Sequence, residues 1–219
     1  MRRMLCLFAT CLACGAAAAQ PADPARELYE RTVRGDDAAL AQLRSAAESG
    51  DAASEYWLGS AYFQGSATLA TDPALGVRWL EKAAMRGYPA AQYMLGHRYL
   101  HGFDVPKDAS KALLWWTSAA QGGSAQAQLD LGIAYVEGQL LPKNDARGFM
   151  WIHQAAEQGS ETAMTYLGRM YANGVGVQKD PAQALRWLEQ PFRKGEPHAR
   201  ALYEQLCREN AGLCEKRQP

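Results

Sequence analysis

The sequence predicts an all-helical protein, on the basis of its composition and of a repeat that runs through most of the chain. Its 219 residues include 40 Ala but only six Val and two Ile. Ala has the highest helix propensity, whereas strands prefer β-branched residues, so this composition favours helices over a sheet. The 48% apolar content is enough to bury a core in a chain of this length.

The charge balance excludes one broad class of partner. The 23 Lys and Arg are matched by 23 Asp and Glu, which gives zero net charge and a pI near 6.9. Generic binding to nucleic acid or to an acidic membrane surface depends on an excess of basic residues. We therefore expect no nucleic-acid partner.

A repeat of 36 or 37 residues determines the fold prediction. The residues that recur in register are a Leu that precedes a Gly, a Tyr one helical turn after the Leu, and a Trp: Leu58, Leu95, Leu131 and Leu167; Tyr62, Tyr99, Tyr135 and Tyr171; Trp79, Trp115, Trp151 and Trp187. Several residue types in one register over successive units indicate a solenoid, in which each unit packs only on its neighbours.

Each unit is predicted to be a helical hairpin, as the second unit illustrates. Leu95 and Tyr99 lie one turn apart on the apolar face of its first helix, and Gly96 removes a side chain where the second helix must come close. Gly102 is placed to end this helix in a left-handed conformation, and Asp108 is placed to cap the start of the second helix. A hairpin with an apolar face on each side must stack on its neighbours.

The predicted organisation, in chain order, is a signal peptide at 1–19, an N-terminal helical cap or degenerate repeat at 20–50, four repeats within 51–195 (52–87, 90–123, 126–159 and 162–195), and a C-terminal capping helix and tail at 196–219. In the fourth unit, Pro191 and Phe192 replace the Ala pair of the earlier units. We expect this proline to break the second helix about one turn early and to end the regular stacking.

The first residues have the layout of a secretory signal peptide. Arg2 and Arg3 precede a short apolar run, and Ala17 and Ala19 offer a cleavage site before Gln20. Export would place the mature protein in the periplasm or outside the cell.

A lipoprotein signal ending at Cys11 or Cys14 is the alternative for this segment. The residues before Cys14 lack the leading Leu that is usual in such signals, which favours simple cleavage. No other apolar run of the sequence approaches the ~20 residues needed to span a bilayer. We therefore expect no membrane insertion after signal cleavage.

Cleavage would leave two cysteines, Cys207 and Cys214, in an oxidising compartment that favours a disulfide. Seven residues of unbroken helix rise ~10.5 Å, well beyond the Cα separation that a disulfide tolerates. We therefore expect a helix to end at residues 210–212 and the two thiols to form a bridge.

The fourth unit shows the repeat pattern most completely: Ala163, Leu167-Gly168, Tyr171, Gly174-Val175-Gly176-Val177, Lys179-Asp180, Gln183-Ala184 and Trp187. With this pattern, residues 52 to 195 resemble the SEL-like repeat (SLR) family, short-repeat relatives of the tetratricopeptide solenoids. The resemblance implies a right-handed α/α superhelix of about four repeats that presents a concave surface to other proteins. The first unit departs from the pattern by an extra loop residue, and the third has residues 139–142 in place of the Gly-Val turn.

The sequence offers no catalytic constellation, although some secreted relatives have been associated with penicillin binding and β-lactamase activity. No Ser is followed three residues later by Lys, and neither Ser-Asp-Asn nor Lys-Thr-Gly occurs. The nucleophile and base of that chemistry are therefore missing. We expect a protein that is not an enzyme and that needs no cofactor.

Two features resemble ligand sites but have simpler explanations. His97 and His101 share one helix face, as a metal site requires, but they provide only two ligands, and Arg98 stands where the zincin pattern has Glu. We interpret both as groove histidines without a metal. The Trp series resembles a sugar-stacking ladder, but its strict register favours core packing.

A second stripe on the first helix of each unit is the candidate binding surface. In the second unit it contains Tyr93, His97 and Leu100, on the side away from the Leu-Gly pair. The predicted groove residues are Tyr56, Phe63, Tyr93, His97, Leu100, His101, Leu129, Ile133, Val136, Arg169 and Asn173. We expect the apolar members to form a continuous strip flanked by the polar ones. The alternative that these side chains only pack within or between repeats stays open.

These features favour an exported, non-enzymatic adaptor that binds a protein or an extended peptide through a concave groove. The alternative, from another class, is a cell-wall-directed protein that binds or processes peptidoglycan or a β-lactam. Covalent labelling by a penicillin would favour the second hypothesis over the first.

Overall fold

The computed structural model describes residues 23–214, which contain twelve helices and no strand. The helices are α1 (Pro24–Val33), α2 (Asp37–Glu48), α3 (Ala52–Gln64), α4 (Pro73–Met85), α5 (Pro89–His101), α6 (Ala109–Gln121), α7 (Ala125–Glu137), α8 (Asp145–Glu157), α9 (Glu161–Asn173), α10 (Pro181–Arg193), α11 (Pro197–Glu209) and α12 (Ala211–Cys214). The all-helical prediction is confirmed.

The predicted signal segment, residues 1–19, lies outside the described residues. None of the described helices is both long and apolar enough to cross a membrane.

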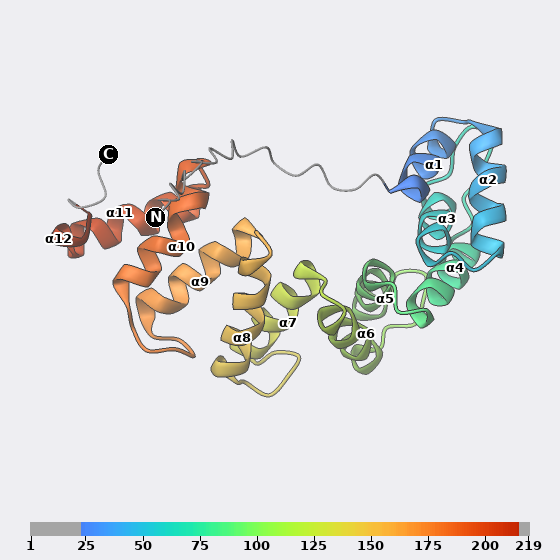
Figure 1. Cartoon of the computed structure of the whole chain (residues 1–219). Helices are drawn as coiled ribbons and strands as arrows, with labels where there is room; N and C mark the ends of the chain where they lie inside the picture. Colours follow the sequence, from blue (N-terminus) through green and yellow to red (C-terminus); the bar gives the residue numbers. More distant parts are fainter. Residues whose placement is uncertain (1–22, 215–219) are drawn as a thin grey trace, which may run out of the picture.

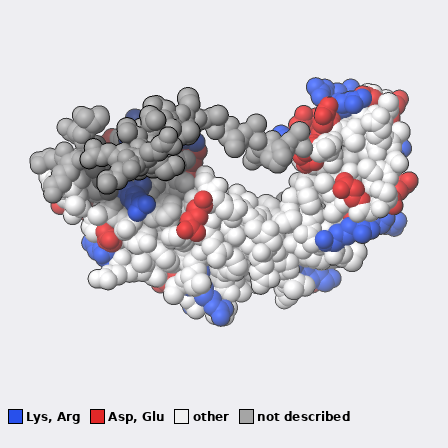
Figure 2. Space-filling view, in the orientation of Figure 1, with Lys and Arg blue, Asp and Glu red and all other residues white. Residues whose placement is uncertain are grey.

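Helices α3 to α10 pair into four hairpins, and the hairpins stack into an open arc (Figure 1). The first helix of each hairpin (α3, α5, α7 and α9) lies toward the hollow of the arc, and its partner lies on the outside. Figure 2 shows this hollow in space-filling form. The arrangement is the solenoid of about four repeats that the sequence predicts, with a concave face built from one helix per repeat.

The predicted start and stop signals of the helices are confirmed. Asp72, Asp108 and Asn144 each accept a hydrogen bond from the N–H three residues on, at 2.9, 3.0 and 3.0 Å, and so cap the second helix of their hairpins. The first helices end at glycines with positive φ, for example 76° at Gly102 and 72° at Gly174. These caps define both ends of the turn within each hairpin.

The two helices of a hairpin touch where their side chains are smallest. In the third repeat, a Cβ added at Gly132 would lie 3.0 Å from the carbonyl oxygen of Gly148, and one added at Gly148 would lie 2.8 Å from the carbonyl oxygen of Gly132. In the second repeat, a Cβ at Gly96 would lie 2.4 Å from Cδ1 of Trp116. Such contacts are too short for a real Cβ, so helix packing requires the Gly that follows each recurrent Leu, as predicted.

The most buried large residue of the second helix lies one position after the recurrent Trp. These residues are Leu80, Trp116, Ile152 and Leu188, which are 0 to 4% exposed. Trp115, in contrast, is half-buried and packs at the edge of a core cluster. The recurrent tryptophans therefore pack against the core clusters, as expected, but at their edges. The next residue, ~100° further around the helix, is the one that faces the Gly of the first helix.

Pro191 does not break α10, contrary to the prediction. The helix runs to Arg193 and has the same 13 residues as the other second helices, with Pro191 buried inside it. A proline removes the hydrogen bond of one N–H. This position is close to the helix end, and the Glu196 N–H still bonds to the Pro191 carbonyl oxygen at 3.0 Å and closes the turn.

Helix α11 adds another layer to the stack. Ala199 and Leu206 of α11 share a core cluster with Leu185 and Leu188 of α10. The expected end of regular stacking at α10 is therefore wrong. The row of first helices, and with it the concave face, extends by one helix.

The predicted disulfide is present. Cys207 and Cys214 are bridged, with their Cα atoms 5.6 Å apart. Helix α11 ends at Glu209 and α12 begins at Ala211, so the helix does end between the two cysteines. The bridge ties α12 to the last layer of the stack.

Side-chain amides join successive repeats at a recurrent position. Gln92 of α5 donates from Nε2 to the carbonyl oxygen of Ala84 near the end of α4 at 3.0 Å, and Gln128 makes the same bond one repeat later. Each of these carbonyl oxygens also accepts from a backbone N–H, that of Gly87 or Gly123, so the amide adds a second bond that ties the next repeat to the helix end. The first repeat has Glu55 in this register, and its buried carboxylate accepts from Arg86 at 3.1 Å.

The glycine contact gives a testable prediction. Gly132→Ala should lower the free energy of unfolding by about 1 to 3 kcal/mol, because the new methyl group overpacks the contact with Gly148. Gly212→Ala is the matched control: no neighbouring atom lies within 4 Å of a Cβ added there, so stability should stay the same or rise slightly. Urea denaturation followed by circular dichroism measures both. Equal stability of the two variants would contradict the packing role.

The two adjacent tryptophans of α6 give a second prediction. Trp116→Ala should lower the free energy of unfolding by about 3 to 5 kcal/mol, because it opens a cavity between the two helices of the hairpin. Trp115→Ala should cost less, because this side chain is already partly in water. Thermal denaturation compares the pair. A larger loss of stability for Trp115→Ala than for Trp116→Ala would show that the recurrent Trp, and not the residue after it, is the central core residue.

Candidate functional site

Several predicted groove residues meet in a recess between α5 and α7. His97, Leu100 and His101 of α5 and Ile133 of α7 line a cavity of about 250 Å³. Tyr93 lies beside it, with its ring 5.3 Å from that of His97. Both helices lie toward the hollow of the arc, so the recess belongs to the concave face. The floor of the hollow is largely free of charged side chains in Figure 2.

A hydrogen bond holds α5 to α7 beside this recess. The Tyr93 hydroxyl donates to Oδ2 of Asp130 at 2.8 Å, and Nε2 of Gln126 donates to Oδ1 of Asp130 at 3.2 Å. Burial, together with the bond to this carboxylate, raises the pKa of Tyr93 above its ordinary value. The phenol therefore stays protonated at neutral pH and continues to donate. Tyr93 joins the two repeats in addition to bordering the groove.

His97 lies near the same carboxylate, with Nε2 4.0 Å from Oδ2 of Asp130. Partial burial lowers the pKa of His97 and outweighs the attraction of Asp130, which acts in the opposite direction. The imidazole is therefore neutral at pH 7, with one nitrogen able to donate and the other able to accept. Its ring lies 5.1 Å from that of His101 and 5.6 Å from that of Trp116.

Trp116 contributes an unsatisfied donor to this region. Its side chain lines the recess and is 4% exposed, and its indole N–H has no hydrogen-bond partner among the described residues. A buried donor without a partner costs stability. The nitrogen itself is buried and faces α5, where a Cβ added at Gly96 would lie 2.8 Å from it, so a bound segment cannot reach it.

Phe103, which was not among the predicted groove residues, lies beside the recess and packs on His101. It is 59% exposed, and its ring lies 5.4 Å from that of His101. Leu140, which is 37% exposed, lines the recess from the turn after α7. The signal for Phe103 was its place directly after Gly102, where the fourth repeat has the partly buried Val175. A large aromatic side chain in this turn is not required by the repeat.

Tyr56 and Phe63 line a second cavity, of about 360 Å³, formed by residues of α1, α3 and α5. Tyr56 packs edge-on against Trp57, with ring centroids 4.8 Å apart. Phe63 is covered by Arg98, whose guanidinium carbon lies 3.3 Å from the ring centroid. Phe63 is therefore not open apolar surface, and a partner that approached this ring would meet Arg98 first.

Arg98 also holds the turn that carries Phe103. It is paired with Asp104, which has a φ of 59°. The fourth repeat has Gly176 at the same position, with a φ of 69°. A non-glycine residue in this left-handed region costs ~1 to 2 kcal/mol, and the ion pair with Arg98 helps to hold Asp104 in it.

The remaining predicted residues do not complete one continuous strip. Leu129 was expected in the groove, but it is 3% exposed and belongs to a core cluster with Leu167. It therefore fits the packing interpretation, because its neighbours in α8 and α9 cover it. Ile133 and Val136 are half-buried, and the exposed Asn173 lines none of these cavities. The concave face carries separate recesses.

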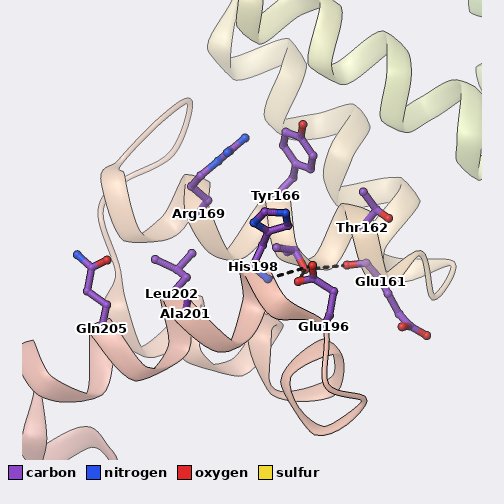
Figure 3. Close-up of a pocket in the computed structure, with 10 residues that line it drawn as sticks. Glu161, Thr162, Tyr166, Arg169, Glu196, His198, Ala201, Leu202 and Gln205 are labelled. Atoms are coloured by element: carbon purple, nitrogen blue, oxygen red, sulfur yellow. Dashed lines mark hydrogen bonds between the residues drawn. The ribbon is translucent and has the colours of Figure 1, made fainter.

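A third cavity, of about 640 Å³, lies between α9 and α11 (Figure 3). Arg169, a predicted groove residue, lines it from α9, and Leu202 lines it from α11. The α11 side was missed because residues 196–219 were interpreted only as a cap. The signal was present in the sequence: Ala199 stands one repeat length after Ala163, in the register of the buried Ala91 and Ala127.

The described part of the chain shows no group of three or more His, Cys, Asp and Glu side chains that could hold a metal ion. The α5–α7 recess is lined by His97 and His101 and by two carboxylates, those of Glu137 and of Asp130, whose oxygens already accept from Tyr93 and Gln126. The chemistry that this recess can offer is therefore hydrogen bonding and apolar contact.

Four segments of the chain, residues 52–88, 89–124, 125–160 and 162–190, match the Sel1 repeat family. No curated protein matches the chain. Among solved structures, a Sel1 repeat protein from Oxalobacter formigenes is 32% identical, with a TM-score of 0.76, over 79% of this chain and 50% of that protein's chain. A protective antigen of uropathogenic Escherichia coli strains, which displays an SLR fold, is 37% identical, with a TM-score of 0.68, over 73% of this chain and 34% of the antigen's chain.

The chain thus spans between a third and a half of the length of these two relatives. The segments that match follow the same helical hairpins that the Leu-Gly register predicts, with the same caps and the same close helix contacts. On the family match, the repeat register and the architecture together, the chain belongs to the Sel1 repeat family.

Proposed function

We propose that the protein is exported and that its concave face binds an extended segment of a partner protein. Sel1 repeat proteins generally mediate protein–protein interactions and are typically non-enzymatic scaffolds. The observation that carries the proposal is the recess between α5 and α7, because it combines exposed apolar side chains with polar groups that a peptide backbone can pair with.

The chemistry of this recess suits an extended peptide. Phe103 and Leu140 offer apolar surface at its edges, and single exposed side chains of this size are available to a partner without unfolding. The imidazole of His97, which lines the recess, can pair with backbone carbonyl and amide groups. An extended segment presents both kinds of group in alternation, with side chains on either side of a polar backbone.

We propose no catalytic role for this recess. The residues that line it include no Ser, Thr or Cys, so it holds none of the usual side-chain nucleophiles of acyl transfer. Covalent labelling of the purified protein by a penicillin would contradict this proposal and would favour a cell-wall-directed function.

Removal of the exposed aromatic side chains should weaken partner binding without unfolding the protein. The double variant Phe103→Ala/His101→Ala should capture a partner at least tenfold less efficiently, a loss of about 1.4 kcal/mol. Its melting temperature should stay unchanged, because both side chains are exposed. Crosslinked capture from extracts of the native compartment, quantified by mass spectrometry, measures the loss.

Leu114→Ala is the matched control for this experiment. Leu114 is as exposed as Phe103, at 62%, but it lies on α6, outside the hollow. This variant should retain the captured partners. Loss of the same partners by Leu114→Ala, or their retention by the double variant, would show that the recess is not the binding site.

Export gives a separate prediction. The mature protein should begin at Gln20 and carry the Cys207–Cys214 bridge without free thiols, because the bridge forms in an oxidising compartment. N-terminal sequencing and mass spectrometry of the unreduced protein measure both. An uncleaved Met1, a lipidated Cys14 or two alkylatable thiols would contradict export by simple cleavage.

A further inference from the structure

We propose that the cavity between α9 and α11 binds an acidic side chain of the partner segment, with Arg169 as its ion-pair partner. This inference rests on the proposed function. It specifies the charge of the side chain at one position of the bound segment. It also assigns a binding role to α11, beyond that of a cap.

The cavity lies between two successive first helices of the stack. Tyr166 and Arg169 line it from α9, and Leu202 and Gln205 line it from α11 (Figure 3). Its volume of about 640 Å³ exceeds that of the α5–α7 recess, which is about 250 Å³. The cavity can therefore accept a complete side chain together with the backbone that carries it.

The two carboxylates at this cavity are already compensated. Glu161 is paired with Lys194. Glu196 caps α11, where its oxygens accept hydrogen bonds from the N–H groups of His198 and Ala199. The start of a helix carries a partial positive charge, which offsets the charge of a carboxylate placed there. These interactions reduce the repulsion that an incoming anion would meet from the two carboxylates.

Arg169 is a cation without a carboxylate partner. No carboxylate oxygen among the described residues lies within 4.0 Å of its guanidinium nitrogens. The guanidinium carbon lies 4.5 Å from the centre of the Tyr166 ring, a contact that orients the group but uses none of its N–H donors in a hydrogen bond. A guanidinium presents paired donors in one plane, which match the two oxygens of a carboxylate.

This charge is specific to the fourth repeat. The positions equivalent to Arg169 in the first three repeats are Ser60, His97 and Ile133. The rest of the lining suits a peptide, because Leu202 supplies apolar surface and Gln205 supplies a side-chain amide. A segment that lies along the concave face passes through this cavity in the middle of its chain and has no terminal carboxylate there. The carboxylate that it offers to Arg169 therefore belongs to an Asp or Glu side chain.

Selection from a random peptide library tests the inference on the mature, full-length chain. The peptides are displayed as N-terminal fusions, so none has a free C-terminus. Peptides bound by the wild type should be enriched in Asp or Glu at one position. As synthetic peptides, they should bind about fivefold more weakly, or worse, when this acid is replaced by its amide at low ionic strength. Arg169→Gln should abolish the difference between acid and amide.

Arg186→Gln is the matched control, because Arg186 is an exposed arginine on α10, outside the hollow. This variant should keep the preference for the acid. The inference would be overturned if the selected peptides showed no preference for an acid. It would also be overturned if Arg169→Gln left such a preference unchanged. In both cases the proposed function would stand, because peptides still bind. If no peptide binds the wild type, both the inference and the proposed function are overturned.

Discussion

The contact between Gly132 and Gly148, together with its counterparts in the other repeats, is the constraint on which the rest of the structure depends. Because the first helix has no Cβ at Gly59, Gly96 and Gly132, the two helices of these hairpins approach until an added Cβ would lie 2.9 to 3.1 Å from a backbone carbonyl oxygen of the second helix. The hairpin is then thin enough for the Leu before each Gly to be buried completely. Leu58, Leu95, Leu131 and Leu167 are 0 to 1% exposed. Each repeat packs on its neighbours in the stack, so a wider hairpin would disturb both of them.

This constraint divides the first helix of each repeat into positions that must be kept and positions that can vary. One face meets the partner helix, and a second holds the preceding repeat through bonds such as that from Gln92 to Ala84. The stripe toward the hollow has no partner of fixed shape, and it carries Ser60, His97, Ile133 and Arg169 at one register. Substitutions in this stripe can therefore change the chemistry of the concave face without changing the fold.

The fold was predictable from the sequence because it depends on backbone features that only a few residue types allow. Examples are the close helix approach at Gly96, the helix end at Gly102 and the helix cap at Asp108. The site was less predictable, because periodicity does not specify how far a neighbouring repeat covers a side chain. Leu129 has the same register as Tyr93 but is buried, since Met164 and Leu167 of α9 lie in the same cluster. Phe103 lies in a turn, where the helical period gives no information.

The separate recesses constrain how any partner is recognised. A uniform apolar groove would accept a segment in either direction and in several registers. Here the α3–α5 end is aromatic, the α5–α7 recess presents imidazoles, and the α9–α11 cavity presents a guanidinium. Between α7 and α9 the stripe is filled by the buried Leu129. On the proposed function, a bound segment would have to match the spacing of the recesses as well as their chemistry. Engagement of several recesses by one chain would favour a single direction and register.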